Sequence, residues 1–150
     1  MHLAQINIGR LVAPEGDPRV ADFYAGLDEI NALAEASPGF VWRLIDGDTN
    51  NATSLRPFEG DPDMLINISV WESRDALFDY VYRSAHMDFL RRRREFFLPM
   101  GEVFTALWWI PEGHTPGIEE SIERLEHLRE HGPTPYAFTF RSAFEPQPAV

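Results

Sequence analysis

Apolar and polar residues alternate in two segments of the chain. In residues 3–11 (LAQINIGRL), one face is formed by Ala4, Ile6 and Ile8, and the other by Gln5, Asn7 and Gly9. In residues 64–71 (MLINISVW), one face is formed by Met64, Ile66, Ile68 and Val70, and the other by Leu65, Asn67, Ser69 and Trp71. Successive side chains of a β-strand point to opposite sides, so this alternation predicts two half-buried strands.

Three further apolar segments predict strands, at residues 40–45 (FVWRLI), 103–110 (VFTALWWI) and 136–144 (YAFTFRSAF). Each is short, rich in aromatic and β-branched residues, and bounded by turn-forming residues. The polar stretch 46–63 is predicted to be a long connection. We expect the tail after residue 144 to be loosely held.

The pattern between the first two strands is helical. Apolar residues recur every three or four positions from Val20 through Phe23, Leu27 and Ile30 to Ala34, which predicts a helix with one apolar stripe. The preceding Asp17-Pro18 suits an N-cap followed by the first helical position. The sequence Ser-Pro-Gly at 37–39 is expected to end this helix.

Two more helices are predicted further along the chain. Ser73 suits the N-cap of a helix over about 74–97, with a break expected near Ser84 because the apolar stripe changes position there. Thr115 is expected to cap a third helix, which Gly132 ends. The stripe of this third helix is formed by Ile118, Ile122, Leu125 and Leu128.

The predicted order is therefore β-α-β-β-α-β followed by α-β. The first six elements are typical of an α+β fold with a ferredoxin-like antiparallel sheet and helices on one face. We expect a single domain over residues 1–150, with a core at about 3–110 and an extension at about 115–144. Large apolar residues lie on both faces of the strands, so a second copy of the chain is expected to cover the second face as a homodimer.

The composition narrows the functional classes. A net charge of −11 argues against binding nucleic acid or an anionic membrane surface. The absence of cysteine excludes thiol catalysis. All thirteen basic residues are arginines, so a lysine Schiff base is also excluded. No apolar run reaches the length of a membrane span, and the first residues do not form a secretory signal, so we expect a cytoplasmic protein.

Amides in the middle of strands are the strongest candidate site residues. Asn7 and Asn67 lie beside large apolar neighbours, with Gln5 and Ser69 on the same faces. A buried amide must find hydrogen-bond partners. These residues therefore either pair with one another across the sheet or line a cavity and hold an oxygen of a ligand.

Aromatic residues and one histidine could complete such a pocket. Trp71 lies on the same strand face as Asn67, either as a core residue or as the wall of a site for a flat aromatic substrate. His86 is a candidate general base, although a lone histidine on an apolar helix face is often structural. Tyr82 and Phe89 on the same helix, together with Trp42 and Trp109 on strands, are candidate substrate-binding residues.

Other patterns carry less functional weight. The pair His127 and His131 has a spacing that suits zinc but lacks a third ligand pattern, so no metal site is expected. The run Arg91 to Arg94 spans a helical turn and is interpreted as a solvated collar, from which Arg93 could reach inward. No Gly-rich phosphate loop, G-x-S-x-G or H-E-x-x-H motif is present.

Several phrases together resemble a known superfamily. "SPGFVWRL", "SVWESRDAL" and the following helix histidine resemble the dimeric α/β-barrel superfamily of antibiotic-biosynthesis monooxygenases, over about residues 1–110. "INALAEASPGFVWRL", "LRRRREFF", "LWWIPEGH" and "GPTPYAFTFR" resemble, over about residues 3–144, the bacterial domain-of-unknown-function family 3291 within it. The resemblance implies a barrel dimer with a pocket between the sheet and the helices of each subunit.

The resemblance also implies a set of site residues. Cofactor-free oxygenases of the superfamily use strand asparagines and a tryptophan, which Asn7, Asn67 and Trp71 match. In haem-degrading relatives the histidine lies about a turn and a half earlier than His86, so haem ligation is disfavoured and no cofactor is expected. We therefore expect a small-molecule enzyme, specifically a cofactor-independent monooxygenase acting on an aromatic or polyketide-like substrate. An isomerase or cyclase in the same pocket, or a non-catalytic ligand-binding or structural dimer, are the alternatives.

Overall fold

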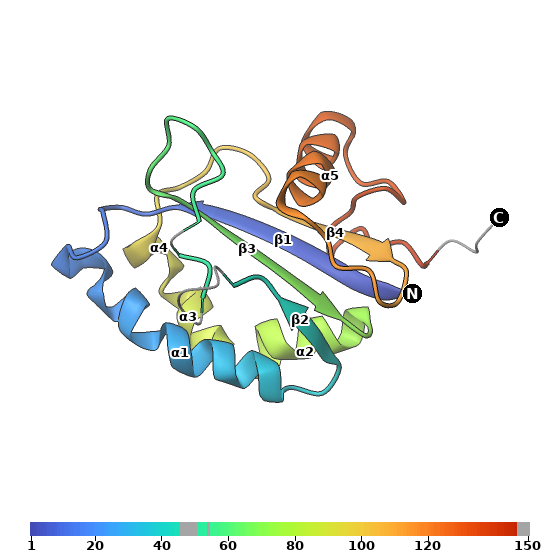
Figure 1. Ribbon diagram of the computed structural model, residues 1–150, viewed down its shortest axis with the longest axis horizontal. Coiled ribbons are helices and arrows are strands. Elements are labelled where there is room, and N and C mark those ends of the chain that lie inside the picture. Colours follow the sequence, from blue (N-terminus) through green and yellow to red (C-terminus); the bar gives the residue numbers. More distant parts are fainter. Residues whose placement is uncertain (46–50, 54, 147–150) are drawn as a thin grey trace.

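The computed structural model describes residues 1–45, 51–53 and 55–146. Figure 1 shows a sheet with helices on both sides. Within the described residues, the elements in chain order are β1 (His2–Arg10), η1 (Pro18–Val20), α1 (Ala21–Ala36), β2 (Phe40–Arg43), β3 (Met64–Trp71), α2 (Arg74–Arg83), α3 (His86–Arg91), α4 (Arg93–Phe96), β4 (Thr105–Ile110) and α5 (Ile118–His131). The fold is α+β, as the sequence predicts.

The sheet has four strands in the order β2-β3-β1-β4, and all neighbours are antiparallel. This order is that of the ferredoxin-like split βαβ arrangement. The two alternating segments lie side by side at its centre, where Asn7 of β1 faces Asn67 of β3 and Gln5 faces Ser69. The register places the polar residues of both strands on one face.

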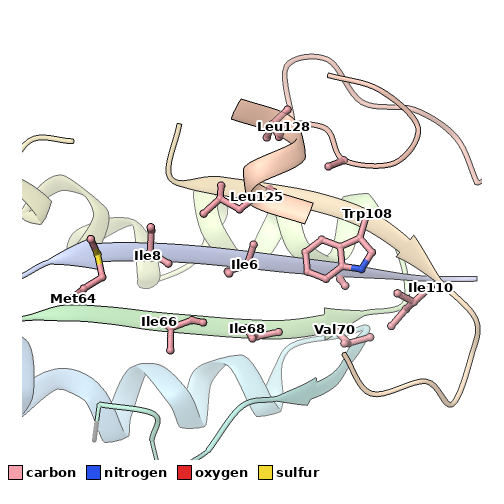
Figure 2. Packing of buried hydrophobic residues seen from close by; sticks show 13 residues of the cluster. Ile6, Ile8, Met64, Ile66, Ile68, Val70, Trp108, Ile110, Leu125 and Leu128 are labelled. Carbon is pink, nitrogen blue, oxygen red and sulfur yellow. The ribbon is translucent and has the colours of Figure 1, made fainter. Parts of the chain in front are cut away.

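The opposite face forms the largest apolar core. Figure 2 shows Ile6, Ile8, Ile68 and Trp108 of the sheet beneath Leu125 and the rest of α5. The buried apolar residues of β1, β3 and β4 on this face are 5% exposed or less, so the single chain covers most of it. Within the described residues, α5 and the connections beside it cover the face that was expected to be covered by a second copy, and association of two copies stays a prediction.

Two of the three predicted N-caps are formed, and the third is not. The Asp17 side chain accepts a hydrogen bond from the Arg19 backbone N–H at 2.9 Å, and Ser73 accepts from Ala76 N–H at 3.1 Å, as expected. Thr115, by contrast, does not cap α5. That helix begins later, with Gly117 as its N-cap.

The segment predicted as one helix over 74–97 forms three short helices, so that prediction is wrong in its extent. The expected break at Ser84 is confirmed, because this residue has extended backbone angles of φ −124° and ψ −177°. Its hydroxyl bonds to the Tyr80 carbonyl and accepts from His86 N–H. Such side-chain bonds to the backbone compete with the helical ladder.

The predicted fifth strand at 136–144 is not formed. Phe138 makes a single bridge to Leu107 of β4, with two hydrogen bonds of 2.8 Å. A tight turn between Thr134 and Ala137, closed by hydrogen bonds of 2.9 and 3.2 Å, immediately precedes this bridge. The chain therefore crosses the edge of the sheet instead of running along it.

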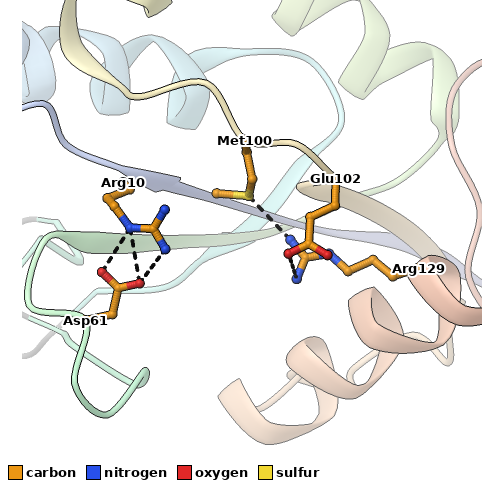
Figure 3. Close-up of polar contacts among 5 residues, drawn as sticks. All are labelled: Arg10, Asp61, Met100, Glu102 and Arg129. Carbon is orange, nitrogen blue, oxygen red and sulfur yellow. Dashed lines mark hydrogen bonds and ion pairs between the residues drawn. The ribbon is translucent and has the colours of Figure 1, made fainter.

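Ion pairs link two of the long connections to β1 and α5. Figure 3 shows Arg10 at the end of β1 bound to Asp61, with 2.6 Å between Nη2 and Oδ2. It also shows Arg129 of α5 beside Glu102, with Nη1 and Oε1 at 3.3 Å, and Arg129 Nη2 at 3.4 Å from Met100 Sδ. Both connections flank the sheet, and these contacts fix where they run.

Candidate functional site

A cavity of about 600 Å³ lies between the sheet and the helices α1 to α4. Its floor is the polar face of β1 and β3. The stripe of α1 forms part of its roof with Phe23, Leu27, Ile30 and Ala34. The first three of these stripe residues are only half-buried, because they face the cavity. This volume lies within the usual range for sites that bind small molecules.

The floor of the cavity carries a connected hydrogen-bond network. Gln5 Nε2 donates to Asn67 Oδ1 at 2.7 Å and to Ser69 Oγ at 2.8 Å. Asn7 Nδ2 donates to Gln5 Oε1 at 3.1 Å and to Asn67 Oδ1 at 3.2 Å. Trp71 Nε1 donates to the same Ser69 hydroxyl at 2.9 Å. Five side chains from two strands are therefore held as one unit.

This network leaves two polar atoms unused at the cavity surface. Among the described residues, no group accepts from Asn67 Nδ2, and none donates to Asn7 Oδ1. Asn67 is also the one exposed residue of β3, although buried residues surround it along the strand. The two readings of the amides are thus compatible: they pair with each other and still present one donor and one acceptor to a ligand.

An aromatic wall closes one end of the cavity. The Tyr80 ring stacks on Trp71, with ring centroids 5.1 Å apart and an interplanar angle of 26°. The His86 ring also contacts Tyr80, with ring centroids 4.8 Å apart. Burial raises the pKa of Tyr80, so its phenol stays neutral and donates to the Ile30 carbonyl at 3.3 Å. Tyr80 therefore supports both the tryptophan and the histidine.

His86 is held in one tautomer. Its Nδ1–H donates to the Val81 carbonyl at 3.2 Å, so in the neutral ring Nε2 carries the lone pair. Burial lowers the pKa of His86 from 6.5, and the hydrogen bond to Val81 opposes this shift. The ring is thus a neutral base at pH 7, on the wall of the cavity.

Arg93 reaches inward from the arginine run. Its guanidinium lines the cavity, donates to the Ile8 carbonyl at 3.3 Å, and lies 4.2 Å from the centre of the Phe104 ring. Burial lowers the pKa of this group, although a guanidinium remains a cation. Its neighbour Arg92 instead binds Asp22 and Glu95 on the surface.

The predicted substrate-binding residues divide into two pairs. Phe89 and Tyr82 line the cavity, and Tyr82 is 41% exposed, with its ring beside Phe78 and Phe140. Trp42 lies apart from the cavity, because it packs against the core on the opposite face of the sheet. Trp109 also lies outside the cavity lining, and its Nε1 donates to the Phe144 carbonyl at 2.7 Å. The alternation along short strands does not show where a cavity ends.

Sequence reasoning did not name every residue of the site. Tyr80 was missed, although it lies three residues after Leu77 on the apolar side of α2, where both line the cavity. Arg43 was also missed; its side chain is 8% exposed and pairs with Glu35. An arginine among the apolar residues of a short strand was the available signal.

The remaining histidines lie elsewhere. The rings of His127 and His131 are 4.3 Å apart on α5, on the other side of the sheet from the cavity. Within the described part of the chain, no group of three or more potential ligands is arranged to hold a metal ion. Over the same residues, no helix combines the length and apolar character that a membrane span requires.

The sequence profile of a family described as a domain of unknown function, DUF3291, matches residues 2–150. The chain belongs to this family. No protein with curated annotation matches it.

Solved structures share the fold at low sequence identity. SnoaB, a cofactor-independent oxygenase from Streptomyces nogalater, matches with a TM-score of 0.51 and 17% identity, over 74% of this chain and 94% of its own. Rv0793 from Mycobacterium tuberculosis matches with a TM-score of 0.54 and 16% identity, over 77% and 100%. A proposed antibiotic biosynthesis monooxygenase from Chloroflexus aurantiacus matches with a TM-score of 0.50 and 17% identity, over 78% and 100%. The fold is thus of the antibiotic-biosynthesis-monooxygenase type.

Proposed function

We propose that this protein is a small-molecule enzyme that oxygenates an aromatic or polyketide-like substrate without a bound cofactor. The observation that carries the proposal is the exposed Asn67 amide, which projects from a buried strand into a cavity shared with a neutral histidine base. The name of SnoaB as a cofactor-independent oxygenase supports the same chemistry on the same fold.

The first proposed step is deprotonation. His86 Nε2 accepts the proton of a phenol or enol, and its lowered pKa keeps it in the accepting form at neutral pH. Asn67 Nδ2 donates to the resulting oxyanion, which stabilises the charge in a largely apolar cavity. The buried Trp71 stacks on Tyr80 and so holds that ring at the cavity wall, where the substrate ring packs.

Molecular oxygen then reacts with the electron-rich ring carbon of the anion. The substrate supplies the electrons, a C–O bond forms, and protonation by His86 gives a hydroperoxide. Loss of water converts the C–H position to a carbonyl. The net reaction of a phenol with O₂ yields a quinone and water, with one oxygen atom in each product.

Oxygen uptake with anthrone and related polycyclic phenols tests this proposal. We expect uptake and quinone absorbance with the wild-type protein, and loss of both in His86→Gln and Asn67→Ala. His114→Gln is the matched control, because His114 is an exposed histidine that bonds to Glu120 outside the cavity. Turnover that is unchanged in both cavity variants would contradict the site assignment.

An isomerase or cyclase is the second candidate, because His86 and Asn67 would serve equally for enolisation. Anaerobic incubation separates the two, since only oxygenation requires O₂. A purely binding protein would retain ligand affinity but give no product under either condition.

A further inference from the structure

The charged residues among the described residues that line the cavity are all arginines. They are Arg43, Arg93 and Arg141, and no aspartate or glutamate is among them. The whole chain carries 24 acidic residues against 13 basic ones. The cavity is therefore positively charged inside a strongly acidic protein.

Arg93 is the half-buried arginine of this set that lacks a carboxylate; Arg141 also makes no ion pair within the described residues, but its side chain is exposed to water. Other arginines find one: Figure 3 shows Arg10 on Asp61 and Arg129 beside Glu102, and Arg43 pairs with Glu35 at 2.9 Å. Within the described residues, Arg93 makes no ion pair. Its protein contacts are the Ile8 carbonyl and the rings of Phe97 and Phe104, at 4.8 and 4.2 Å from the guanidinium carbon. Buried charges in proteins are normally paired.

The position of this cation relative to the amides is set by β1. A Cβ atom added at Gly9 would lie 3.3 Å from Arg93 Nη2, so the guanidinium lies over Gly9. Gly9 follows Asn7 by two residues on the same face of the strand, a separation of about 7 Å. The cavity floor therefore offers an amide site and, about 7 Å further along, a cationic site.

We infer that the cavity binds an aromatic anion. Its phenolic oxygen lies at Asn7 and Asn67, and its carboxylate lies at the Arg93 guanidinium. This inference rests on the proposed function in using the same cavity, and it names the substrate class. A guanidinium sandwiched between two phenylalanine rings is fixed in position, and its planar donors match a carboxylate in a bidentate manner. The acidic surface opposes the bound charge only from outside the cavity, because no carboxylate is among the described residues that line it.

A matched pair of fluorescent probes tests the inference by binding alone. 6-Hydroxy-2-naphthoate has a hydroxyl and a carboxylate at opposite ends of two flat rings, and 6-hydroxy-2-naphthamide differs from it only in charge. We expect the wild-type protein to prefer the acid about tenfold or more, as for a charge-assisted hydrogen bond. The preference is expected to weaken as salt is added.

Arg93→Gln is expected to abolish this preference while leaving the affinity for the amide within about twofold. Arg94→Gln is the matched control, because Arg94 is the exposed neighbour in the same run and lies outside the cavity. Arg93→Lys retains the charge and replaces Arg93→Gln in the experiment if that variant does not fold. It should keep part of the preference for the acid. Circular dichroism checks the folding of each variant.

Three results would overturn the inference. The wild-type protein could bind the acid and the amide equally, the preference for the acid could survive in Arg93→Gln, or neither probe could bind. Arg93 would then be a structural cation held by the two rings. The proposed function and this inference can fail separately. If binding depends on charge but no oxygen is consumed, only the proposed oxygenation is wrong. If neutral phenols are oxygenated and the protein shows no charge preference, only the proposed anion site is wrong.

Discussion

Asn7 and Asn67 face each other across the two central strands, and the Asn7 Nδ2 donates to the Asn67 Oδ1 at 3.2 Å. This contact orients Asn67 so that its own amide nitrogen points away from its protein partners. Gln5 strengthens the orientation by donating to the same Oδ1 atom at 2.7 Å. The donor offered to the cavity is therefore fixed before any ligand arrives, as electrostatic stabilisation of an anion requires.

Asn67 is expected to lower the pKa of a bound phenol. Because its Nδ2 donates to the ionised form, the hydroxyl of bound 6-hydroxy-2-naphthamide should ionise at lower pH in the wild-type protein than in a variant without this donor. Asn67→Ala should remove the shift, and Asn67→Asp should reverse it by placing a carboxylate beside the oxygen. Absorbance titration of the bound naphthol measures its pKa in the wild-type protein and in the two variants. If the Asn67→Asp variant behaves like the wild type, this placement of the nitrogen is wrong.

Ser69 is expected to be energetically coupled to Trp71. Ser69→Ala leaves the buried indole N–H without its acceptor, which should lower the free energy of unfolding by about 1–3 kcal/mol. In a Trp71→Phe background, Ser69→Ala should lower the free energy of unfolding by less, because no indole N–H remains. Denaturant unfolding of the four proteins gives a coupling energy, expected to be about 0.5–3 kcal/mol. Strict additivity would show that the bond contributes nothing.

Gly26 is expected to be required for the roof of the cavity. A Cβ atom at this position would lie 1.9 Å from the Phe89 Cζ, so Gly26→Ala should push that ring into the cavity. Helix propensity alone would stabilise the variant by about 1 kcal/mol. We expect instead a loss of about 1–3 kcal/mol from overpacking, together with weaker probe binding.

The matched control for this change is Gly101→Ala, where an added Cβ would meet nothing within 4 Å. Adding Phe89→Leu to Gly26→Ala should recover part of the stability by vacating the ring position. Thermal melts compare the four proteins, and a Gly26→Ala variant more stable than the wild type would contradict the predicted clash.

His86 is expected to make stability depend on pH. Burial lowers its folded pKa below the ordinary value of 6.5, so between these two values the unfolded chain binds more protons than the folded one. The free energy of unfolding therefore rises with pH through this window and falls as pH drops below 6.5. His86→Gln should flatten this dependence in urea titrations, whereas the exposed control His114→Gln should leave the contribution of His86 unchanged. The same pKa should appear in turnover, with activity rising as His86 loses its proton.

The sequence by itself determined the central strands and their faces. Apolar residues at Ala4, Ile6 and Ile8 require burial, and with a period of two this necessarily places Gln5 and Asn7 together on the other side. Short-range signals were equally sufficient for the Asp17 and Ser73 caps and for the Ser84 break, because each depends on hydrogen bonds between residues close in sequence. The resemblance to a family correctly identified the fold type, and the strand residues that it implies, Asn7, Asn67 and Trp71, line the cavity.

Only the tertiary structure decided what covers each face and where the cavity ends. Trp42 and Trp71 both lie on strands, but the antiparallel register sends them to opposite sides of the sheet. The packing of α5 on the second face depends on contacts between residues far apart in the chain. The inward turn of Arg93 from a run of four similar residues depends likewise on Gly9, whose missing side chain leaves space for the Phe97 ring that the guanidinium contacts. Such choices rest on long-range packing, which local patterns of apolar and polar residues do not specify.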